Sequence, residues 1–136
     1  MDRVFVDTDV ILDLLAKRDP HYQYSARLFS MADQNEILLC VSSLSFSNLN
    51  YILSKQFSSD QARKKLLTFK ALVSVLNVSE KTVELALNSE FQDFEDALQY
   101  FTALESKVTT LLTRNNKDYK KANISVLTPE QFIKSR

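Results

Sequence analysis

The chain of 136 residues contains no glycine. This absence excludes the glycine-rich loops that bind phosphate groups in dinucleotide-binding and P-loop proteins. It also argues against many tight hairpins, because their turns favour glycine at positive φ. With only two prolines to interrupt helices, the chain is expected to be mostly helical, with short connections between its elements.

The charge balance and the cysteine content narrow the class of protein further. The 17 Lys and Arg residues balance 17 Asp and Glu residues, so any binding to nucleic acid requires a local basic patch. The single cysteine, Cys40, rules out an internal disulfide and suits a reducing compartment. We expect one domain over residues 1–136, in the cytoplasm and without a membrane-spanning segment.

Short apolar runs rich in β-branched residues alternate with helical patterns along the chain. This alternation predicts an α/β domain of three layers, α/β/α, around a mostly parallel sheet of four or five strands. The predicted strands are Val4–Val6, Ile37–Val41, Val73–Val78 (a strand or an extended connection), Val108–Thr113 and Ser125–Leu127.

The helices between these runs carry recognisable start signals. Asp19 and Pro20 predict an N-cap and a first helical position, and Thr128, Pro129 and Gln131 predict a capping box. In one helix, we expect Leu66, Leu67 and Phe69 to face the core. The predicted helices cover Leu12–Ala16, Pro20 to about Asn35, Phe46–Leu53, Gln61 to about Leu72, a segment capped by Ser79, and Phe94–Leu104.

The first predicted strand runs directly into three carboxylates. Asp7, Asp9 and Asp13 fall within seven positions. Asp7 stands at the carboxyl end of the strand, where open α/β sheets bind their ligands. A structural alternative is that Asp7 caps the following helix and that the other two charges are solvated.

Further polar groups are predicted to meet at the same edge of the sheet. Right-handed crossovers bring the carboxyl ends of parallel strands together. We therefore expect four groups to converge there: Asp7, the helix start near Asn48, and the turns at Asp93–Asp96 and Arg114–Asp118. Carboxylates that converge repel one another unless a hard cation such as Mg²⁺ or Mn²⁺ binds them. Such an ion activates water and holds a phosphodiester, so metal-assisted hydrolysis is the chemistry that this set favours.

Four segments, taken in order, resemble the sequence motifs of the PIN-domain family. The first is similar to the family's opening Asp-Thr-Asn-Val motif, although Asp9 replaces the usual asparagine. The resemblance extends over nearly the whole chain. The segments are Phe5–Asp13, Ser42–Leu53, Asp93–Gln99 and Leu112–Tyr119, and Val126–Glu130 is similar to the family's closing strand and helix.

The resemblance implies a metal-dependent endoribonuclease, which in prokaryotes is commonly the toxin of a toxin–antitoxin pair. It implies Mg²⁺ or Mn²⁺ as cofactor, RNA as substrate, and an antitoxin protein and a second copy of the chain as partners. Asp7 and Asp96 match the first and third acidic ligands of the family. Asn48 stands where the family usually has glutamate, and Asn115 where the fourth acid often falls; Asp118 is expected to substitute for it.

These matches define a set of candidate site residues. We expect Asp7 and Asp96 to hold the metal and Asp118 to assist directly or through water. Asn48 and Asn115 would orient water or the scissile phosphate. The expected RNA contacts are Arg114, Lys117 and Thr8, and the secondary site candidates are Asp9 and Asp93.

Two other functions compete with this hypothesis. The two asparagines at usually acidic positions favour a degenerate PIN domain that binds nucleic acid or protein without cleaving it. The pair Asp7 and Asp9 has the spacing of a nucleophile and an acid in covalent phosphotransfer, but we find no lysine and threonine placed to complete such a site.

Overall fold

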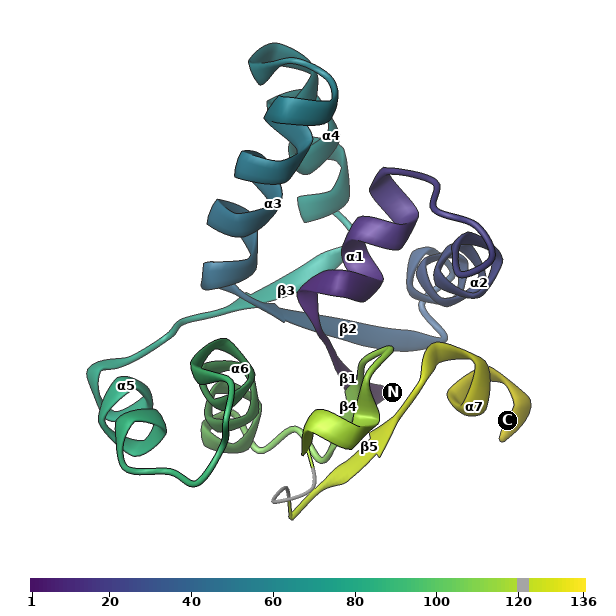
Figure 1. The fold of residues 1–136 in the computed structure, drawn as a ribbon. Coiled ribbons are helices and arrows are strands. Elements are labelled where there is room, and N and C mark those ends of the chain that lie inside the picture. Colours follow the sequence, from purple (N-terminus) through teal and green to yellow (C-terminus); the bar gives the residue numbers. More distant parts are fainter. Residues whose placement is uncertain (120–122) are drawn as a thin grey trace.

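Five parallel strands form the central sheet of the computed structural model, which describes residues 1–119 and 123–136 (Figure 1). The expected three-layer α/β architecture is therefore confirmed, with a fully parallel sheet in the described residues. The strands are β1 (Asp2–Val6), β2 (Ile37–Ser42), β3 (Val73–Leu76), β4 (Thr110–Leu112) and β5 (Ser125–Leu127).

The order of the strands, β3-β2-β1-β4-β5, places β1 at the centre. The chain builds outward from β1 through β2 to β3, and then returns to the other side of β1 to add β4 and β5. This reversal leaves a crevice at the carboxyl ends of β1 and β4, the usual ligand position in open α/β sheets. The ladder continues past β1, since the Asp7 N–H donates to the Leu112 carbonyl at 2.9 Å.

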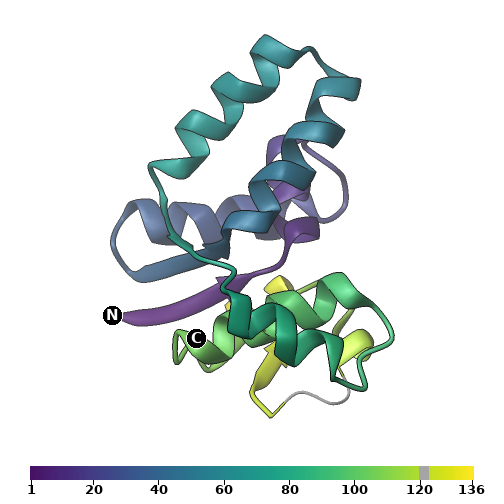
Figure 2. The ribbon, with the colours of Figure 1, turned by 90° about the vertical axis from the view of Figure 1, so that its left-hand side faces the viewer.

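Helices cover both faces of this sheet (Figures 1 and 2). The first four helices and the last lie on one face, and α5 and α6 lie on the other. The helices α3 and α4 pair with each other and extend beyond the sheet. The bounds are α1 (Thr8–Leu15), α2 (Tyr22–Asp33), α3 (Ser43–Gln56), α4 (Ser59–Lys70), α5 (Glu80–Leu87), α6 (Phe94–Glu105), the 3₁₀ helix η1 (Asn116–Tyr119) and α7 (Pro129–Lys134). Among the described helices, none has the length and apolar character needed to cross a membrane.

The alternation of side chains along β1 divides the core between the two layers. Val4 and Val6 pack into the cluster formed with α1, α2, α3 and α4. Phe5 points the other way and packs with Cys40 and with Tyr100 of α6. Cys40 is buried and has a free thiol, as its apolar neighbours predict.

Most helix starts follow the sequence signals. Ser79 caps α5, and Thr128 and Gln131 form the predicted capping box at α7. The prediction for α2 was wrong, because Asp19 and Pro20 lie in a turn before the helix, which begins at Tyr22. This turn is closed by the Tyr22 N–H, which donates to the Arg18 carbonyl at 2.7 Å.

Other boundaries also differ from the predicted ones. The first helix begins at Thr8, four residues earlier than its run of helix formers, because Asp7 caps it. The strand predicted from Val108 is shortened to β4, which begins at Thr110. Leu67 is 70% exposed, which contradicts its predicted core position, because α4 extends past the sheet and is covered mainly by its partner α3.

Three helix ends adopt the left-handed conformation without glycine. Lys17, Asn35 and Lys107 have φ values of 50°, 60° and 60°. At the end of α6, the Val108 N–H donates to the Ala103 carbonyl and the Lys107 N–H to the Leu104 carbonyl, both at 3.0 Å. This paired pattern is the Schellman motif, which usually has glycine at the left-handed position.

Replacing Lys107 by glycine is expected to raise the free energy of unfolding by roughly 1 kcal/mol, because glycine adopts positive φ without a Cβ clash. Urea unfolding followed by circular dichroism measures the change. Lys107→Ala keeps the Cβ and serves as the control. A glycine variant no more stable than the alanine variant would contradict this account of the helix end.

Candidate active site

The Asp7 carboxylate is buried at the carboxyl end of β1, with 7% of the residue exposed. Its Oδ1 accepts a hydrogen bond from the Thr8 N–H at 2.7 Å and lies 3.4 Å from the amide nitrogen of Gln99. Its Oδ2 accepts from the hydroxyls of Thr113 and Tyr119, each at 3.0 Å. Asp7 is therefore both the N-cap of α1, as the structural alternative proposed, and the centre of a converging polar site.

The Tyr119 hydroxyl connects Asp7 to the second predicted acid. Its oxygen lies 3.0 Å from Oδ2 of Asp7 and 3.4 Å from Oδ1 of Asp96. A hydroxyl has one proton to donate, so it satisfies only one of these carboxylates at a time. The structure thus brings Asp7, which follows β1, and Asp96, in the first turn of α6, to opposite sides of one donor.

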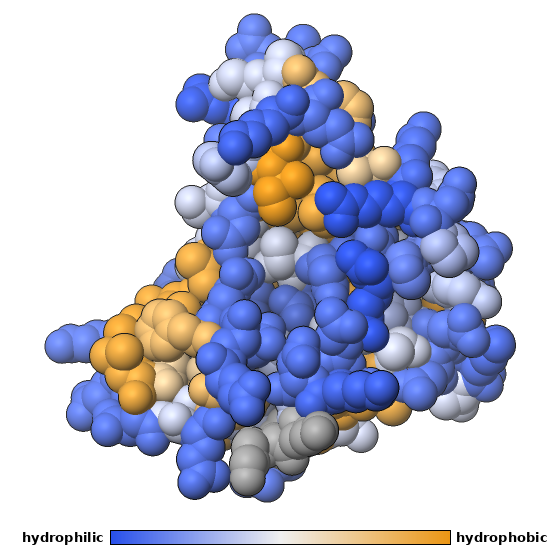
Figure 3. All heavy atoms as spheres, in the orientation of Figure 1, coloured by the Kyte–Doolittle hydropathy of each residue, from blue (hydrophilic) through white to orange (hydrophobic). Residues whose placement is uncertain are grey.

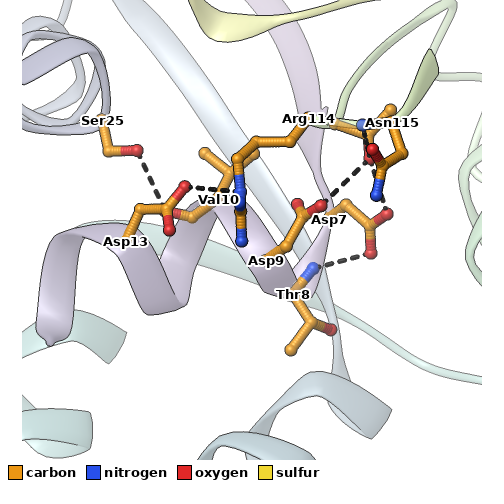
Figure 4. Close-up of polar contacts among 9 residues, drawn as sticks. Asp7, Thr8, Asp9, Val10, Asp13, Ser25, Arg114 and Asn115 are labelled. Carbon is orange, nitrogen blue, oxygen red and sulfur yellow. Dashed lines mark hydrogen bonds and ion pairs between the residues drawn. The ribbon is translucent and has the colours of Figure 1, made fainter. Parts of the chain in front are cut away.

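Asp9 and Asp13 continue the acidic series along α1 toward Arg114. The Arg114 Nε lies 2.9 Å from a carboxylate oxygen of Asp13, which is almost fully buried. Figure 4 shows this ion pair, with Asp9 on the side nearer Asp7. One Asp9 oxygen lies 3.4 Å from the Thr113 hydroxyl, and the other is buried without a hydrogen-bond partner.

A buried glutamine holds the region behind Asp7. Gln99 is fully buried, and its amide nitrogen donates to the hydroxyl oxygens of Thr8 at 3.0 Å and Ser45 at 3.1 Å. Those two oxygens lie 2.8 Å apart. The network joins α1, α3 and α6, so the Thr8 hydroxyl makes hydrogen bonds inside the protein. Its predicted contact with RNA stays a prediction.

The Asn48 side chain points to Glu95 and makes no hydrogen bond to Asp7. Its amide nitrogen donates instead to a carboxylate oxygen of Glu95 at 3.0 Å, a contact between α3 and α6. Next to Glu95, Asp93 caps α6 by accepting from the Asp96 N–H at 3.0 Å. Asp93 is therefore the N-cap of α6.

A hollow of about 530 Å³ opens beside Asp96. Lys117 and Asp118, from η1, line it together with Asp93 and Asp96, and Phe91 forms an apolar part of its wall. The sequence-predicted acid Asp118 therefore shares a cavity with Asp96. The carboxylates around this cavity outnumber its one lysine. The cavity therefore suits a ligand that binds together with a cation.

Burial and mutual repulsion weaken the acidity of this cluster. Burial and the neighbouring Asp9 raise the pKa of Asp7 to about 6. Burial, followed by the charges of Asp7, Asp93 and Asp118, raises the pKa of Asp96 to about 7. Near neutral pH, the Asp96 carboxyl is therefore partly protonated, and a bound cation would replace that proton.

The donors around the carboxylates stay protonated. Burial and the charges of Asp7 and Asp96 raise the pKa of the Tyr119 hydroxyl well above its usual value. Tyr119 therefore acts as a hydrogen-bond donor over the whole range in which the protein is folded. Its ring packs edge-on against Phe91, with ring centres 5.9 Å apart, which fixes the position of the hydroxyl.

The donor set fits a hard divalent cation. Asp7 and Asp96 both lie within 3.4 Å of the Tyr119 hydroxyl, and one buried Asp9 oxygen lacks a hydrogen-bond partner. Mg²⁺ is usually held by one or two carboxylates, completed by water and substrate phosphate. Within the described parts of the chain, no group of three or more His, Cys, Asp or Glu side chains is placed to hold a metal ion, so this site is of the sparse kind.

The structure places the remaining predicted residues around this pair. Asn115 contributes a backbone N–H, which donates to the Thr113 hydroxyl at 3.3 Å. Arg114 is held by Asp13 and is 30% exposed at its side chain. The roles predicted for Asn115 in orienting water, and for Arg114 and Lys117 in binding RNA, stay predictions.

The sequence analysis missed three residues that contact Asp7. Thr113 and Tyr119 lie inside the fourth motif, but the predicted site residues of that motif were its acid Asp118, its amide Asn115 and its basic residues. Gln99 had a usable signal, because an uncharged polar residue stands between Leu98 and Tyr100 in an apolar helical segment. A buried amide in such a place requires hydrogen-bond partners.

The parallel sheet, its reversal point and the two carboxylates define an α/β protein with an acidic site at the carboxyl end of its central strand. A profile of the PIN domain family matches residues 3–117. Ribonuclease VapC1 of Aquifex aeolicus (strain VF5) is 32% identical over 139 residues, which cover 96% of this chain and 93% of that protein. The chain belongs to the PIN-domain family.

Solved structures agree with this fold. VapBC2 from Rickettsia felis, bound to a DNA fragment from its promoter, gives a TM-score of 0.70 at 22% identity, over 92% of this chain and 96% of that one. Mycobacterium tuberculosis VapC20, a toxin that cleaves the sarcin-ricin loop, gives 0.69 at 14% identity, over 87% and 94%. At these identities the likeness concerns the fold.

Replacing Asp96 by asparagine should stabilise the cation-free protein at high pH. The pKa of Asp96 is raised from 3.8 to about 7, so its contribution to stability is present below pH ~4 and is lost as the pH rises through ~7. Because this carboxylate is partly exposed and therefore screened, we expect a gain of about 1–2 kcal/mol at pH ~8 and almost none at pH ~4. Urea unfolding in EDTA at both pH values measures it, and a gain independent of pH would contradict the assignment.

Tyr119→Phe tests the shared donor. The change keeps the ring and removes the hydroxyl, so the free energy of unfolding should fall by about 2 kcal/mol, the usual value of a hydrogen bond to a charged group. Tyr51→Phe is the matched control, because Tyr51 is 63% exposed on α3, and its effect should stay below about 0.5 kcal/mol. Equal effects of the two variants in thermal or urea unfolding would contradict the role of Tyr119.

Proposed function

We propose that the protein is a metal-dependent endoribonuclease that cleaves RNA as the toxin of a toxin–antitoxin pair. The observation that carries the proposal is the convergence of Asp7 and Asp96 on the Tyr119 hydroxyl, at the crevice between β1 and β4. The relation to ribonuclease VapC1 supports the ribonuclease activity.

In this proposal Asp7 and Asp96 hold Mg²⁺ or Mn²⁺, and Asp118, on the same hollow, assists directly or through water. The cation, when bound, supplies charge to the scissile phosphodiester and lowers the pKa of the attacking water. Thr113 and the amide groups around Asp7 keep its carboxylate in one orientation. The Tyr119 hydroxyl, no longer needed by both carboxylates, is free to donate to a phosphate oxygen.

The positive groups near the hollow give the RNA backbone a place to bind. Lys117 lines the hollow directly, and Arg114 approaches the acidic series from the side of Asp13. With a net charge of zero, the chain attracts RNA only through such local contacts. We therefore expect weak affinity for RNA that depends on salt concentration.

We also propose an antitoxin as protein partner. The Rickettsia felis neighbour was solved as a VapBC2 assembly. In this chain, α5 exposes Val83, Leu85 and Leu87, and α4 exposes Leu67; Figure 3 shows an apolar area in the region of α5. Apolar groups in such positions are available to a partner protein. Association of two copies into a homodimer, and a cytoplasmic location, stay predictions.

A binding module without catalysis is the second candidate. It is favoured by the absence, within the described residues, of a group of three acidic, histidine or cysteine side chains arranged for a metal. Such a module would bind RNA or protein through the same surface and would show no dependence on divalent cations. The two functions therefore differ first in cation binding.

Calorimetric titration with Mn²⁺ separates these functions. We expect the wild type to bind one ion, and Asp7→Asn to weaken binding by at least about tenfold, because Asp7 supplies the most buried charge of the site. Cleavage of a mixed RNA substrate should require the cation and should be lost in the same variant. Absence of binding in both proteins, with both shown to be folded, would overturn the nuclease proposal in favour of the binding module.

A further inference from the structure

A second hollow, of about 390 Å³, lies beside Asp13 and Arg114. It opens between α1, α2 and the start of α7, because Asp13 of α1, Tyr24 of α2 and Gln131 of α7 all line it. None of the described residues that line this hollow also lines the one beside Asp96. The proposed cation site does not use this second hollow.

Arg114 connects this hollow to the region of Asp7. It follows Thr113, whose hydroxyl donates to Asp7 at 3.0 Å, and its side chain extends to Asp13 (Figure 4). Asp13 lies six residues after Asp7 along α1, which corresponds to about 9 Å along a helix axis. A single strand of RNA with a phosphate at Asp7 therefore has a neighbouring nucleotide within reach of the hollow.

The Asp13 carboxylate lines this hollow with unused hydrogen-bond acceptors. Asp13 is 1% exposed, and neither of its carboxylate oxygens has a hydrogen-bond partner among the described residues. The Arg114 Nε lies 2.9 Å from one of them but is itself without a hydrogen-bond partner there. Because buried polar groups are nearly always hydrogen-bonded, these acceptors indicate a ligand that donates N–H groups.

The structural alternative is an ion pair that only ties α1 to the segment after β4. A buried ion pair compensates the loss of hydration when its geometry is good and further hydrogen bonds satisfy both partners. Asp13 and Arg114 attract each other without such hydrogen bonds. The pair is therefore incomplete as a purely structural device, and a ligand in the hollow would complete it.

The charges around the hollow are paired, which disfavours a simple ion as its ligand. Asp13 pairs with Arg114, and Glu130, which also lines the hollow, pairs with Lys134 at 2.9 Å. A cation would meet the Arg114 guanidinium, and a phosphate group would meet two carboxylates. An uncharged ligand with polar edges avoids both repulsions.

The walls of the hollow suit a flat ligand. The rings of His21 and Tyr24 line it, and Pro129 adds apolar surface. Unstacked bases of single-stranded RNA stack on aromatic side chains and on arginine, and they are read by hydrogen bonds to their edges. This hollow offers both kinds of contact.

We propose that the hollow binds a base next to the scissile phosphate and selects bases that carry an exocyclic amino group. This proposal rests on the proposed action on RNA and adds to it a site that selects sequence. Tyr24 stacks on the base, and the Asp13 carboxylate accepts hydrogen bonds from the amino group. Adenine, cytosine and guanine carry such a group, whereas uracil does not and should bind least.

Titration of the ¹⁵N-labelled protein with cytidine and with uridine, followed by NMR in EDTA, tests the proposal. These nucleosides differ in the amino group, carry no phosphate and need no cation, so the result does not depend on cleavage. We expect cytidine to shift the backbone amides of Tyr24, Arg114 and Gln131 and to bind about tenfold more tightly than uridine, because its amino group donates to a charged acceptor.

Variants of Tyr24 and Asp13 separate stacking from selection. Tyr24→Ala should weaken cytidine binding by at least about fivefold, whereas Tyr24→Phe keeps the ring and should bind as the wild type does. Asp13→Asn should reduce the affinity for cytidine to that for uridine. If Asp13→Asn does not fold, the two Tyr24 variants and the comparison of the nucleosides still decide the question.

The possible results separate this inference from the proposed function. A preference for cytidine, together with loss of binding in Tyr24→Ala alone of the two Tyr24 variants, supports the base site. Absence of shifts at these amides, or equal affinity for cytidine and uridine, overturns it and leaves the nuclease proposal intact. Selective cytidine binding in a protein that does not bind Mn²⁺ supports the base site and overturns the nuclease proposal in favour of an RNA-binding module.

Discussion

The burial of one carboxylate, that of Asp7, is the constraint on which the rest of the site depends. A buried charge is tolerated only when donors compensate it, and those around Asp7 come from separate parts of the fold. The start of α1 supplies the Thr8 N–H, the residue after β4 supplies Thr113, and η1 supplies Tyr119. The site is therefore complete only when the sheet and both helical layers have assembled.

This compensation is incomplete, and that incompleteness is the basis of the proposed function. The Tyr119 hydroxyl serves two carboxylates with one proton, and burial raises the pKa values of both Asp7 and Asp96. A fold selected for stability alone would not gather these acids. Proteins are expected to keep such unfavourable interactions at functional sites, where a bound ligand supplies the missing compensation.

Much of the fold follows from local patterns, while particular residues show where such patterns fail. The apolar runs predicted every strand of the described sheet, and Ser79 and Thr128 predicted their helix starts. The failure at Leu67 has a physical reason, since local propensity does not specify which neighbouring element covers a residue. Similarly, the acids Asp7 and Asp96 were predicted as site residues from their motifs, whereas the donors Gln99 and Tyr119 were not predicted.

The sequence by itself determined the alternation of strands and helices, the position of Asp7 at the end of β1, and an acidic chemistry suited to a divalent cation. These properties depend on residue type and near neighbours, which the chain carries in any conformation. The tertiary structure decided that Tyr119 stands between Asp7 and Asp96, and that Asn48 turns to Glu95. Such contacts join residues 23 to 112 positions apart, and only the packing of the layers against the sheet brings them together.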